Sequence, residues 1–358
     1  MSSSPDKADN KRVIPIAYPM EYHEFLCAEG MPADTIFENA GVDTQWFDDP
    51  SKKITIAQYI ALTREGIKHS RTPSLGLLLG NYLSLQSHNY LGFALQSCGC
   101  AAESLELMSQ YARTRFPKME LEFLQDAEIS QLLLEDLSGE ESLQRYNLEV
   151  MAAAIYRGEI TLKKIDRAQS SIDDDEPVNQ DSLRSDMIEI QFEYPQPDDL
   201  SVYQQVFGQV PFSFGHCQTR ILYPTKALLR PFSFANDLSC KLAKAQCQAE
   251  LAELDDRRSF RSQIQAILME NIECPPSLDV VAQQIHLSPR VLSRRLNNEG
   301  TSFQELIDLT RKRIAVKLLE SSDLSVAEIG YRLGYEHPTN FTRAFKKWTN
   351  RSPKDFRS

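Results

Sequence analysis

The sequence predicts two linked parts of different fold class: an α+β domain over residues 13–235 and an all-α domain over residues 259–358. Three observations predict this division. The chain of 358 residues is longer than most single domains. Helix and strand patterns are mixed in the first part, whereas only helical patterns occur in the last hundred residues. Residues 1–258 hold 24 basic and 39 acidic side chains, against 15 basic and 11 acidic in residues 259–358.

Composition narrows the class of protein before any motif is considered. Hydrophobic residues make up 42% and charged residues 25%, as in an ordinary globular protein. No apolar run is long enough for a transmembrane helix, and the polar start lacks the apolar core of a signal peptide. Seven cysteines are an odd number, which favours reduced thiols. We therefore expect a cytoplasmic protein that does not associate with a membrane. Its residues 1–12 are expected to form a disordered tail.

The first part mixes helical and extended patterns. Helices are expected over 33–40, 56–70, 74–85, 101–114, 142–156 and 201–207. Strands are expected over 118–125, 130–136, 187–194, 212–214 and 220–224. A polar, acidic stretch over about 168–183 is expected to be a mobile loop.

A charged helix over 236–258 is expected to link the two domains. Its apolar stripe consists of Leu238, Leu242, Ala245, Ala249 and Ala252. This helix is either a spacer or a surface that forms a dimer.

The last hundred residues contain an internal repeat. Val281–Ser288 aligns with Ile329–Glu336, and Leu292–Leu296 aligns with Phe341–Phe345. Each copy has a short helix with a small residue (Ala282 or Gly330), a turn at His286 or Gly334, and a second helix that begins at Pro289 or Pro338. This is the pattern of a tandem helix-turn-helix.

The second helix of each copy carries polar and basic side chains outside its apolar stripe. A helix of this kind fits the major groove of DNA and presents its first residues to the base edges, while Lys and Arg neutralise phosphates. Arg295, Lys346 and Lys347 are the candidate phosphate contacts. The alternative is a plain helical bundle with a solvated basic face, but two patterns in register within the basic part of an acidic chain favour DNA.

A long helix over 302–320 is expected between the two copies. It would fix the distance between two recognition helices, which should lie about 34 Å apart on one face of DNA. Arg311 on this helix is a candidate phosphate contact, with a solvated face as the alternative.

At these residues the chain closely resembles the AraC/XylS family of bacterial transcription regulators. The match covers about residues 260–357 and includes Leu287–Leu296, Ala327–Tyr335, Phe341–Trp348 and Ser352-Pro353. The resemblance implies two recognition helices in successive major grooves of double-stranded DNA. Carried over by position, it implies that the base-reading side chains are Arg290, Ser293 and Arg294 in the first copy and Thr339, Asn340, Thr342 and Arg343 in the second.

The first part resembles the N-terminal domain of an AraC-type subgroup that includes regulators of ornithine use and of quorum-linked virulence. The landmarks are Gly76–Gly80, Leu91–Ser97, Ala102–Tyr111, Phe207–Phe212 and Leu228–Phe232. This resemblance implies a domain that senses an effector and self-associates. It assigns no ligand-binding residue.

No catalytic residue, metal site or cofactor is predicted. Cys98-Gly99-Cys100 is interpreted as an incidental thiol pair, and Gly76-Leu77-Leu78-Leu79-Gly80 as a helix-packing motif. The favoured function is a ligand-responsive activator that binds promoter DNA as a homodimer and has RNA polymerase as a partner. One alternative is a regulator without a small ligand, controlled by abundance or a protein partner. The less favoured one is an enzyme fused to a DNA-binding domain.

Overall fold

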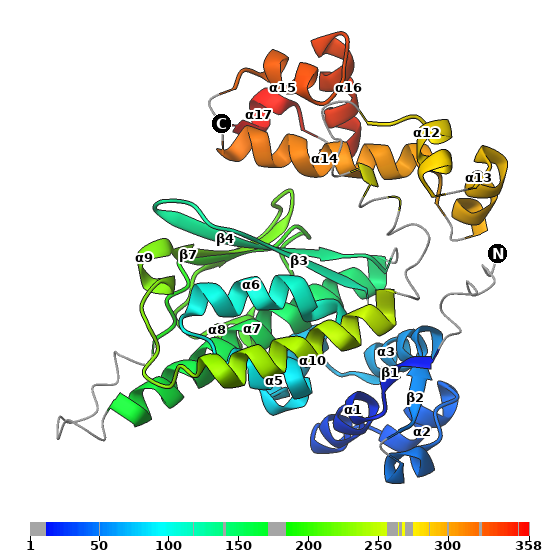
Figure 1. Cartoon of the computed structure of the whole chain (residues 1–358). Helices are drawn as coiled ribbons and strands as arrows, with labels where there is room; N and C mark the ends of the chain where they lie inside the picture. The colour runs from blue at the N-terminus through cyan, green and yellow to red at the C-terminus, as the bar shows by residue number, and fades with distance from the viewer. Residues whose placement is uncertain are drawn as a thin grey trace. The chain divides into compact units, whose positions relative to one another are not determined.

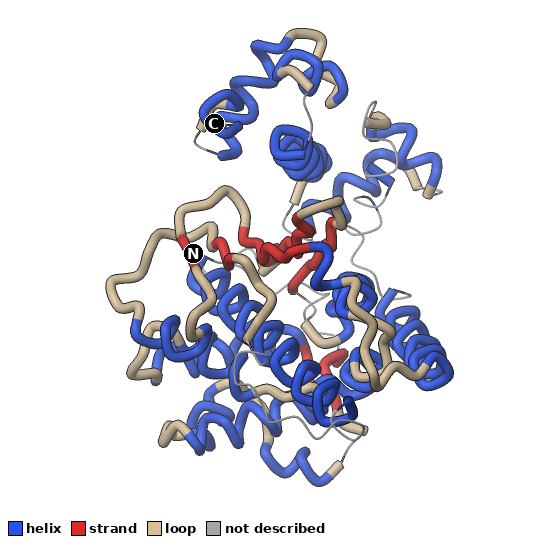
Figure 2. Tube along the Cα trace, turned by 90° about the vertical axis from the view of Figure 1, so that its left-hand side faces the viewer, coloured by secondary structure: helices blue, strands red, loops and turns tan. Residues whose placement is uncertain are grey.

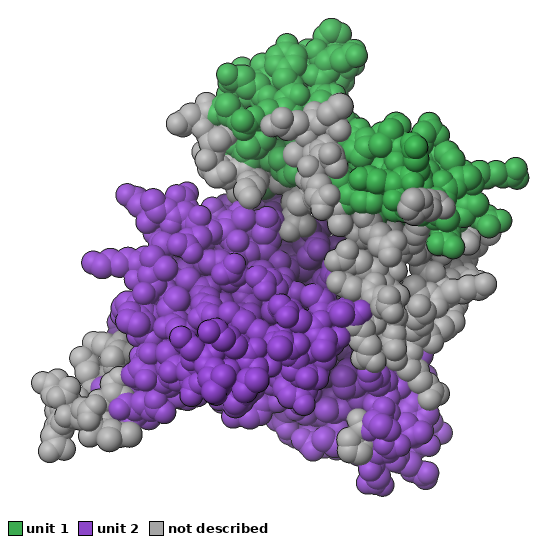
Figure 3. Space-filling view, viewed as in Figure 1, with its two compact units in different colours: residues 1–10, 256–358 green, residues 11–255 purple. Residues whose placement is uncertain are grey.

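A computed structural model provides the coordinates. It describes residues 12–49, 51–116, 118–138, 141–170, 184–255, 264, 267–268, 275–285, 287–298, 301–321, 324–349 and 351–357. The chain divides into two compact units, the N-terminal unit (residues 11–255) and the C-terminal unit (residues 1–10 with 256–358), which Figure 3 distinguishes by colour. No helix among the described residues is both long and apolar enough to cross a membrane.

The N-terminal unit is an α+β domain in which helices outweigh strands (Figure 2). Its strands are β1 (Arg12–Pro15), β2 (Lys53–Thr55), β3 (Met119–Leu124), β4 (Ile129–Asp136), β5 (Glu189–Gln191), β6 (Phe212–Ser213) and β7 (Thr219–Pro224). Its α-helices are α1 (Ala17–Ala28), α2 (Ala33–Asn39), α3 (Ile56–His69), α4 (Leu75–Tyr82), α5 (Asn89–Leu95), α6 (Ala101–Tyr111), α7 (Glu141–Ser170), α8 (Ser201–Phe207), α9 (Thr225–Leu228) and α10 (Asp237–Asp255). Single 3₁₀ turns are η1 (Thr44–Asp48), η2 (Gln86–His88) and η3 (Ala112–Thr114).

Five strands form the main sheet, in the order β3-β4-β7-β5-β6. All neighbours are antiparallel except β5 and β6. Along β7, alternate residues Thr219, Ile221 and Tyr223 are buried, as expected for a strand with one face against the core. Helices α6, α7 and α8 lie along the same side of this sheet (Figure 1), and their apolar side chains share one core with those of the strands.

Helix α7 is the central element of this unit. Its 30 residues span about 45 Å. Its first half contributes Leu148, Met151 and Ala152 to the core beneath the sheet. Tyr146 and Val150 belong to a second apolar cluster, with side chains of α1, α2 and α3. The single helix therefore joins the sheet to the N-terminal helices.

Two glycines bring α4 close to α7. A Cβ added to Gly76 would lie 2.4 Å from the carbonyl oxygen of Tyr146, and one added to Gly80 would lie 2.3 Å from the carbonyl oxygen of Val150. Both separations are far inside van der Waals contact, so only glycine allows the two backbones to approach this closely. The interpretation of Gly76–Gly80 as a helix-packing motif agrees with this contact.

The C-terminal unit is helical throughout its described residues. Its elements are α12 (Leu278–Gln284), α13 (Pro289–Asn298), α14 (Phe303–Ser321), α15 (Val326–Arg332), α16 (Pro338–Thr349) and α17 (Pro353–Arg357). Helix α14 joins the two pairs α12–α13 and α15–α16. The predicted fold class, an α+β domain followed by two helix-turn-helix motifs joined by a long helix, is confirmed.

Several predicted elements differ from the structure in extent. The helix predicted to end at Tyr156 continues to Ser170, because Gly158 lies inside a packed helix rather than at its end. Its last residues include 168–170, which were assigned to the predicted loop, and the rest of that loop lies outside the described residues. The strand predicted over 187–194 shortens to β5, and helices α1 and α5 were not predicted.

Helix α10 buries a different face from the predicted apolar stripe. Cys240, Ala243 and Cys247 are buried in a cluster with side chains of α5 and α6. Leu238 and Leu242 are 69% and 65% exposed, and the three alanines of the stripe are exposed as well. The stripe exists, but none of the described residues buries it.

We expect Gly80→Ala to lower the free energy of unfolding by about 1–3 kcal/mol, because the new methyl group would overlap the Val150 carbonyl. Urea denaturation of the full-length protein measures the change. The matched control is Gly158→Ala, where the added Cβ would meet Leu85 Cδ2 at an acceptable 3.4 Å. In that helix alanine should be neutral or stabilising by up to about 1 kcal/mol. Equal effects of the two substitutions would contradict the close α4–α7 contact.

Candidate functional site

The C-terminal unit contains two small apolar cores on one helix. Leu306 of α14 packs with Val281, Ala282, Leu292 and Leu296. Further along α14, the buried residues Ala315, Val316 and Leu319 pack with apolar side chains of α15 and α16. The distance from Leu306 to Leu319 along the helix axis is about 20 Å. Helix α14 thus holds two helix-turn-helix motifs at a fixed separation.

The first motif begins at two serine caps. The Ser277 hydroxyl accepts a hydrogen bond from the Val280 amide, which caps α12. The Ser288 hydroxyl accepts one from the Val291 amide at 3.4 Å and caps α13, as the sequence predicts. The turn residue His286 lies outside the described residues.

The second motif is built on a capping box and two glycines. The Ser325 hydroxyl and the Glu328 carboxylate each accept the other residue's backbone N–H at the start of α15. Gly334 adopts φ +77°, the left-handed conformation that the turn requires. A Cβ added to Gly330 would lie 3.2 Å from Phe341 Cβ, so the small residue lets α16 pack closely on α15.

Most of the predicted base-reading side chains are on the surface. Exposed positions are Arg290, Arg294, Thr339, Asn340 and Arg343. Ser293 and Thr342 are half-buried. The Thr342 hydroxyl donates to the Pro338 carbonyl at 3.0 Å within its own helix, so it offers only an acceptor to a base edge. All seven residues lie on α13 or α16, the second helix of each motif.

The predicted phosphate contacts divide into two environments. Arg295, Lys346 and Lys347 are exposed. Arg311 is half-buried instead, and its guanidinium lies over the Tyr335 ring at 4.7 Å from the centroid. This contact ties α14 to the turn of the second motif. From the sequence, Arg311 was interpreted as a phosphate contact or as part of a solvated face. Neither interpretation included its packing on Tyr335.

The N-terminal unit encloses a cavity of about 740 Å³. This volume is in the range of small-molecule sites, roughly 300–1,000 Å³. One face of α7 runs along the cavity and contributes Met151, Ala154, Ile155, Gly158, Glu159, Leu162, Lys163, Asp166 and Arg167. The other walls come mainly from α5, α6, Phe116 and the segments 184–186 and 227–232.

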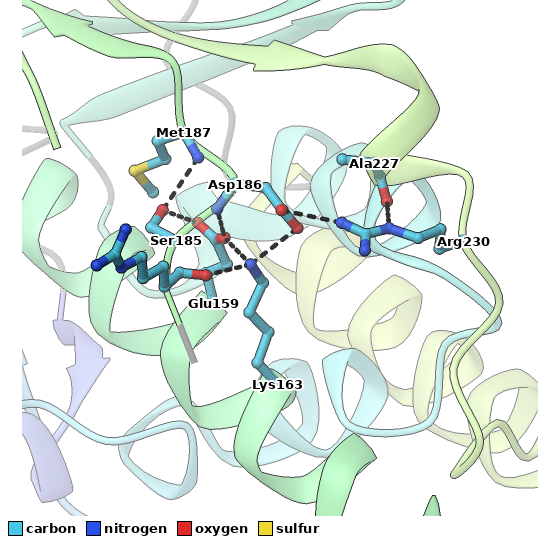
Figure 4. Close-up of polar contacts among 8 residues, drawn as sticks. Glu159, Lys163, Ser185, Asp186, Met187, Ala227 and Arg230 are labelled. Atoms are coloured by element: carbon cyan, nitrogen blue, oxygen red, sulfur yellow. Dashed lines mark hydrogen bonds and ion pairs between the residues drawn. The ribbon is translucent and has the colours of Figure 1, made fainter. Parts of the chain in front are cut away.

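Charged side chains meet at one end of the cavity (Figure 4). The Lys163 ammonium lies 2.8 Å from Asp186 Oδ2 and 3.2 Å from Glu159 Oε1, and it donates to the Arg184 carbonyl at 2.5 Å. On the opposite side of Asp186, Arg230 Nη2 lies 2.9 Å from Oδ1. Glu159 also accepts hydrogen bonds from Ser185 Oγ at 2.7 Å and from the Asp186 amide at 2.6 Å.

Burial changes the protonation of two groups in the cavity wall. Desolvation raises the pKa of Glu159, and the Lys163 ammonium only partly opposes this shift. Desolvation lowers the pKa of His88 to about 4, and the positive charge of Arg115 adds to that effect. His88 is therefore neutral near pH 7. Its Nδ1 lies 3.2 Å from the Tyr18 hydroxyl.

A second polar cluster lies between α5, α6 and α10. Ligand atoms of Cys98, Glu103 and Cys240 lie within 4.8 Å of one another. The Glu103 carboxylate is paired with the Lys244 ammonium at 2.7 Å, and burial raises the pKa of both thiols. The Glu103 carboxylate is also engaged by the Gly99 amide, and three donors are one fewer than the four of a structural zinc site, so we assign no metal to this cluster. The sequence pairs Cys98 with Cys100, whereas the structure also places the Cys240 thiol near Cys98.

The cavity residues were missed from the sequence because the helix that carries them was predicted to end at Tyr156. One signal could have found them. Ile155, Leu162 and Ile165 continue the helical period beyond Gly158, and charged residues recur on the same face at 159, 163 and 166. The segments 184–186 and 227–232 have no such signal, because only the fold brings them to α7.

Comparison with known proteins identifies both units. Residues 281–358 match a family described as "Helix-turn-helix domain". Residues 30–165 match one described as "Arabinose-binding domain of AraC transcription regulator, N-term". The chain belongs to the AraC family of transcription regulators. It is a DNA-binding regulator.

Relatives of this AraC-family chain include one of similar length. The ornithine utilization regulator of Pseudomonas aeruginosa is 28% identical over 345 residues, which is 96% of each chain. The urease operon transcriptional activator of Escherichia coli is 38% identical over 80 residues, 22% of this chain and 27% of that one. The crystal structure of the regulator CdpR from Pseudomonas aeruginosa is 22% identical, covers 95% of this chain and 98% of that one, and has a TM-score of 0.45.

Because Arg294 is exposed on α13, we expect Arg294→Ala to weaken binding to the preferred DNA site by about 1–3 kcal/mol and to relax the preference at one base pair. Lys347→Ala should instead weaken binding to all sequences and reduce the salt dependence. Fluorescence anisotropy with a selected site and a scrambled site, at several salt concentrations, separates the two. Equal weakening on both sites by Arg294→Ala would make Arg294 a phosphate contact.

The buried His88 should make the protein sensitive to acid. Below pH 6.5 the unfolded chain takes up a proton at this histidine, whereas the folded chain does so only near pH 4. The free energy of unfolding should therefore fall with decreasing pH in this window, by up to about 1.4 kcal/mol per pH unit. His88→Gln should remove this contribution. Denaturant unfolding from pH 4.5 to 7 measures it, and an unchanged slope in the variant would contradict a buried neutral imidazole.

Proposed function

We propose that this AraC-family protein is a ligand-responsive transcription activator whose effector binds in the N-terminal cavity. The observation that carries the proposal is a shared apolar cluster. Leu85, Leu91, Leu95 and Leu162 line the cavity, and the same cluster contains the buried face of α10. A ligand that moves these side chains therefore moves the surface on which α10 packs.

A polar connection runs beside this apolar one. His88 lines the cavity, and its carbonyl accepts a hydrogen bond from Arg115 Nε at 3.0 Å. The Arg115 guanidinium, only 2% exposed, lies 2.7 Å from Glu250 Oε2 on α10. Because α10 is the last helix of the N-terminal unit, a shift in this helix reaches the chain that leads to the DNA-binding unit. A ligand acts by binding one arrangement more tightly than the other.

We further propose that the protein acts as a homodimer through α10. The exposed stripe Leu238, Leu242, Ala245, Ala249 and Ala252 repeats at alternating intervals of four and three, which is the spacing of a coiled-coil seam. Exposed leucines in such a row favour association. The effector would then change the position of the two helix-turn-helix motifs of one protomer relative to those of its partner.

The seven predicted positions on α13 and α16, five exposed and two half-buried, are the proposed base contacts. Arg295, Lys346 and Lys347 are the proposed phosphate contacts. We retain Arg311 as a weaker phosphate candidate, because its stacking on Tyr335 supports a role in holding the second motif. Activation is supported by the likeness to the urease operon transcriptional activator, and RNA polymerase is its proposed partner. The alternative of a regulator without a ligand requires no cavity of this size, so the cavity, although partly open, favours a ligand.

A substitution that fills the cavity tests the proposal. The preferred DNA site is first selected from random duplexes with the full-length protein and placed before a reporter gene. Ala154→Phe introduces a large side chain at a cavity-lining position of α7. We expect this variant to bind the selected site with unchanged sequence preference but to give one fixed reporter level across growth media.

The matched control is Ala168→Phe, the same change at an exposed position of the same helix. This control should respond to the medium as the wild type does. A wild-type response from Ala154→Phe would show that the cavity is not the effector site. Circular dichroism and thermal unfolding establish that both variants are folded.

A further inference from the structure

The chemistry of the cavity changes along α7. Lining residues of this helix before position 159 are Met151, Ala154, Ile155 and Gly158, all without charge. From Glu159 onward they include Lys163, Asp166 and Arg167. Met151 and Arg167 are separated by about 24 Å along the helix axis. The cavity is therefore elongated, apolar toward one end and charged toward the other.

We propose that the effector is an elongated amphipathic anion, with its apolar body against the first half of α7 and its anionic group at Lys163 and Arg230. This inference rests on the proposed function and names the ligand class of the same cavity.

The apolar half has the composition of a hydrocarbon-binding site. Leu105, Met108 and Phe116 line the cavity and belong to the same apolar cluster as Met151 and Ile155 of α7. Aliphatic and thioether side chains adapt their rotamers to a flexible chain, and Met does so especially well. Polar side chains are sparse in this half, so a sugar or other polyol would leave most of its hydroxyl groups without partners.

The charged end favours a negative ligand. Four basic residues line it (Lys163, Arg167, Arg184 and Arg230) against three acidic ones (Glu159, Asp166 and Asp186). The Asp166 carboxylate already accepts hydrogen bonds from the Ser233 amide at 2.5 Å and the Ser233 hydroxyl at 2.8 Å.

Lys163 and Arg230 are arranged to share an anion. Both contact Asp186, one from each side, so their charged groups lie near the same carboxylate (Figure 4). The Arg230 side chain is 65% exposed while anchored to Asp186, so its guanidinium can turn toward a second anion without losing a buried contact. Lys163 already donates to Asp186, Glu159 and the Arg184 carbonyl, so a ligand carboxylate beside Asp186 would gain a charge-assisted hydrogen bond from Arg230 and would replace one acceptor of Lys163.

Three ten-carbon probes that differ only in the head group test this inference by isothermal titration calorimetry on the full-length protein. The probes are decanoate, decanol and decylammonium. We expect decanoate to bind about ten-fold more tightly than decanol, and decylammonium to bind least tightly. Ala154→Phe should abolish decanoate binding, because the apolar half of the cavity would be filled.

Arg230→Gln tests the head-group position separately. We expect it to weaken decanoate about five- to ten-fold and to leave decanol unchanged, since the lost contact is ionic. The control Arg157→Gln removes an exposed arginine of α7 that does not line the cavity, and should leave both affinities unchanged.

Three results would overturn the inference: tighter binding of decylammonium than of decanoate, no binding of any probe, or decanoate binding that survives Ala154→Phe. None of these decides the proposed function. That proposal fails only when Ala154→Phe retains the wild-type reporter response, so the two failures are distinguishable.

Discussion

The close contact between α4 and α7 is the constraint on which the N-terminal unit depends. Gly76 and Gly80 remove the side chains that would hold the two backbones apart, and their neighbours on α7 are backbone carbonyls that cannot move aside. The contact positions the first half of α7 between the sheet core and the N-terminal helices. The second half extends beyond this contact and carries the charged face of the cavity. A helix that senses a ligand requires one rigid half that anchors it and another half that faces the cavity.

The charged side chains around the cavity form ion pairs and hydrogen bonds with one another, which explains how they can be partly buried there. Lys163 pairs with Glu159 and Asp186, and Arg230 pairs with Asp186 as well. Glu159 gains two further hydrogen bonds from the segment 185–186. Such a network is stable without ligand, because no charge is left alone in a place of low dielectric. It is also responsive, because Asp186 is shared by two cations whose partners a new anion could exchange.

Apolar and polar contacts both connect this cavity with α10. Helix α10 buries Cys240, Ala243 and Cys247 against the cavity wall and pairs Glu250 with the buried Arg115. Its opposite face keeps two leucines exposed. Under the proposed function, this helix would respond to the cavity on one side and offer an association surface on the other. In the C-terminal unit, each of the two helix-turn-helix motifs packs on α14 through its own apolar core. A single helix therefore sets the distance between the two motifs.

The sequence by itself determined the DNA-binding unit, because its structure depends on local rules. Serine caps, a left-handed glycine and the 3.6-residue stripe specify each helix-turn-helix within about twenty residues, and Ser288, Gly330 and Gly334 have the expected roles. It also indicated the helix-packing role of Gly76 and Gly80. Only the tertiary structure decided the cavity. Asp186 and Arg230 come from separate segments that share no periodicity with α7. The helix that carries Met151 and Glu159 continues through Gly158, and glycine often marks a helix end. The burying face of α10 was decided in the same way, since two stripes compete on that helix and only the position of α5 selects between them.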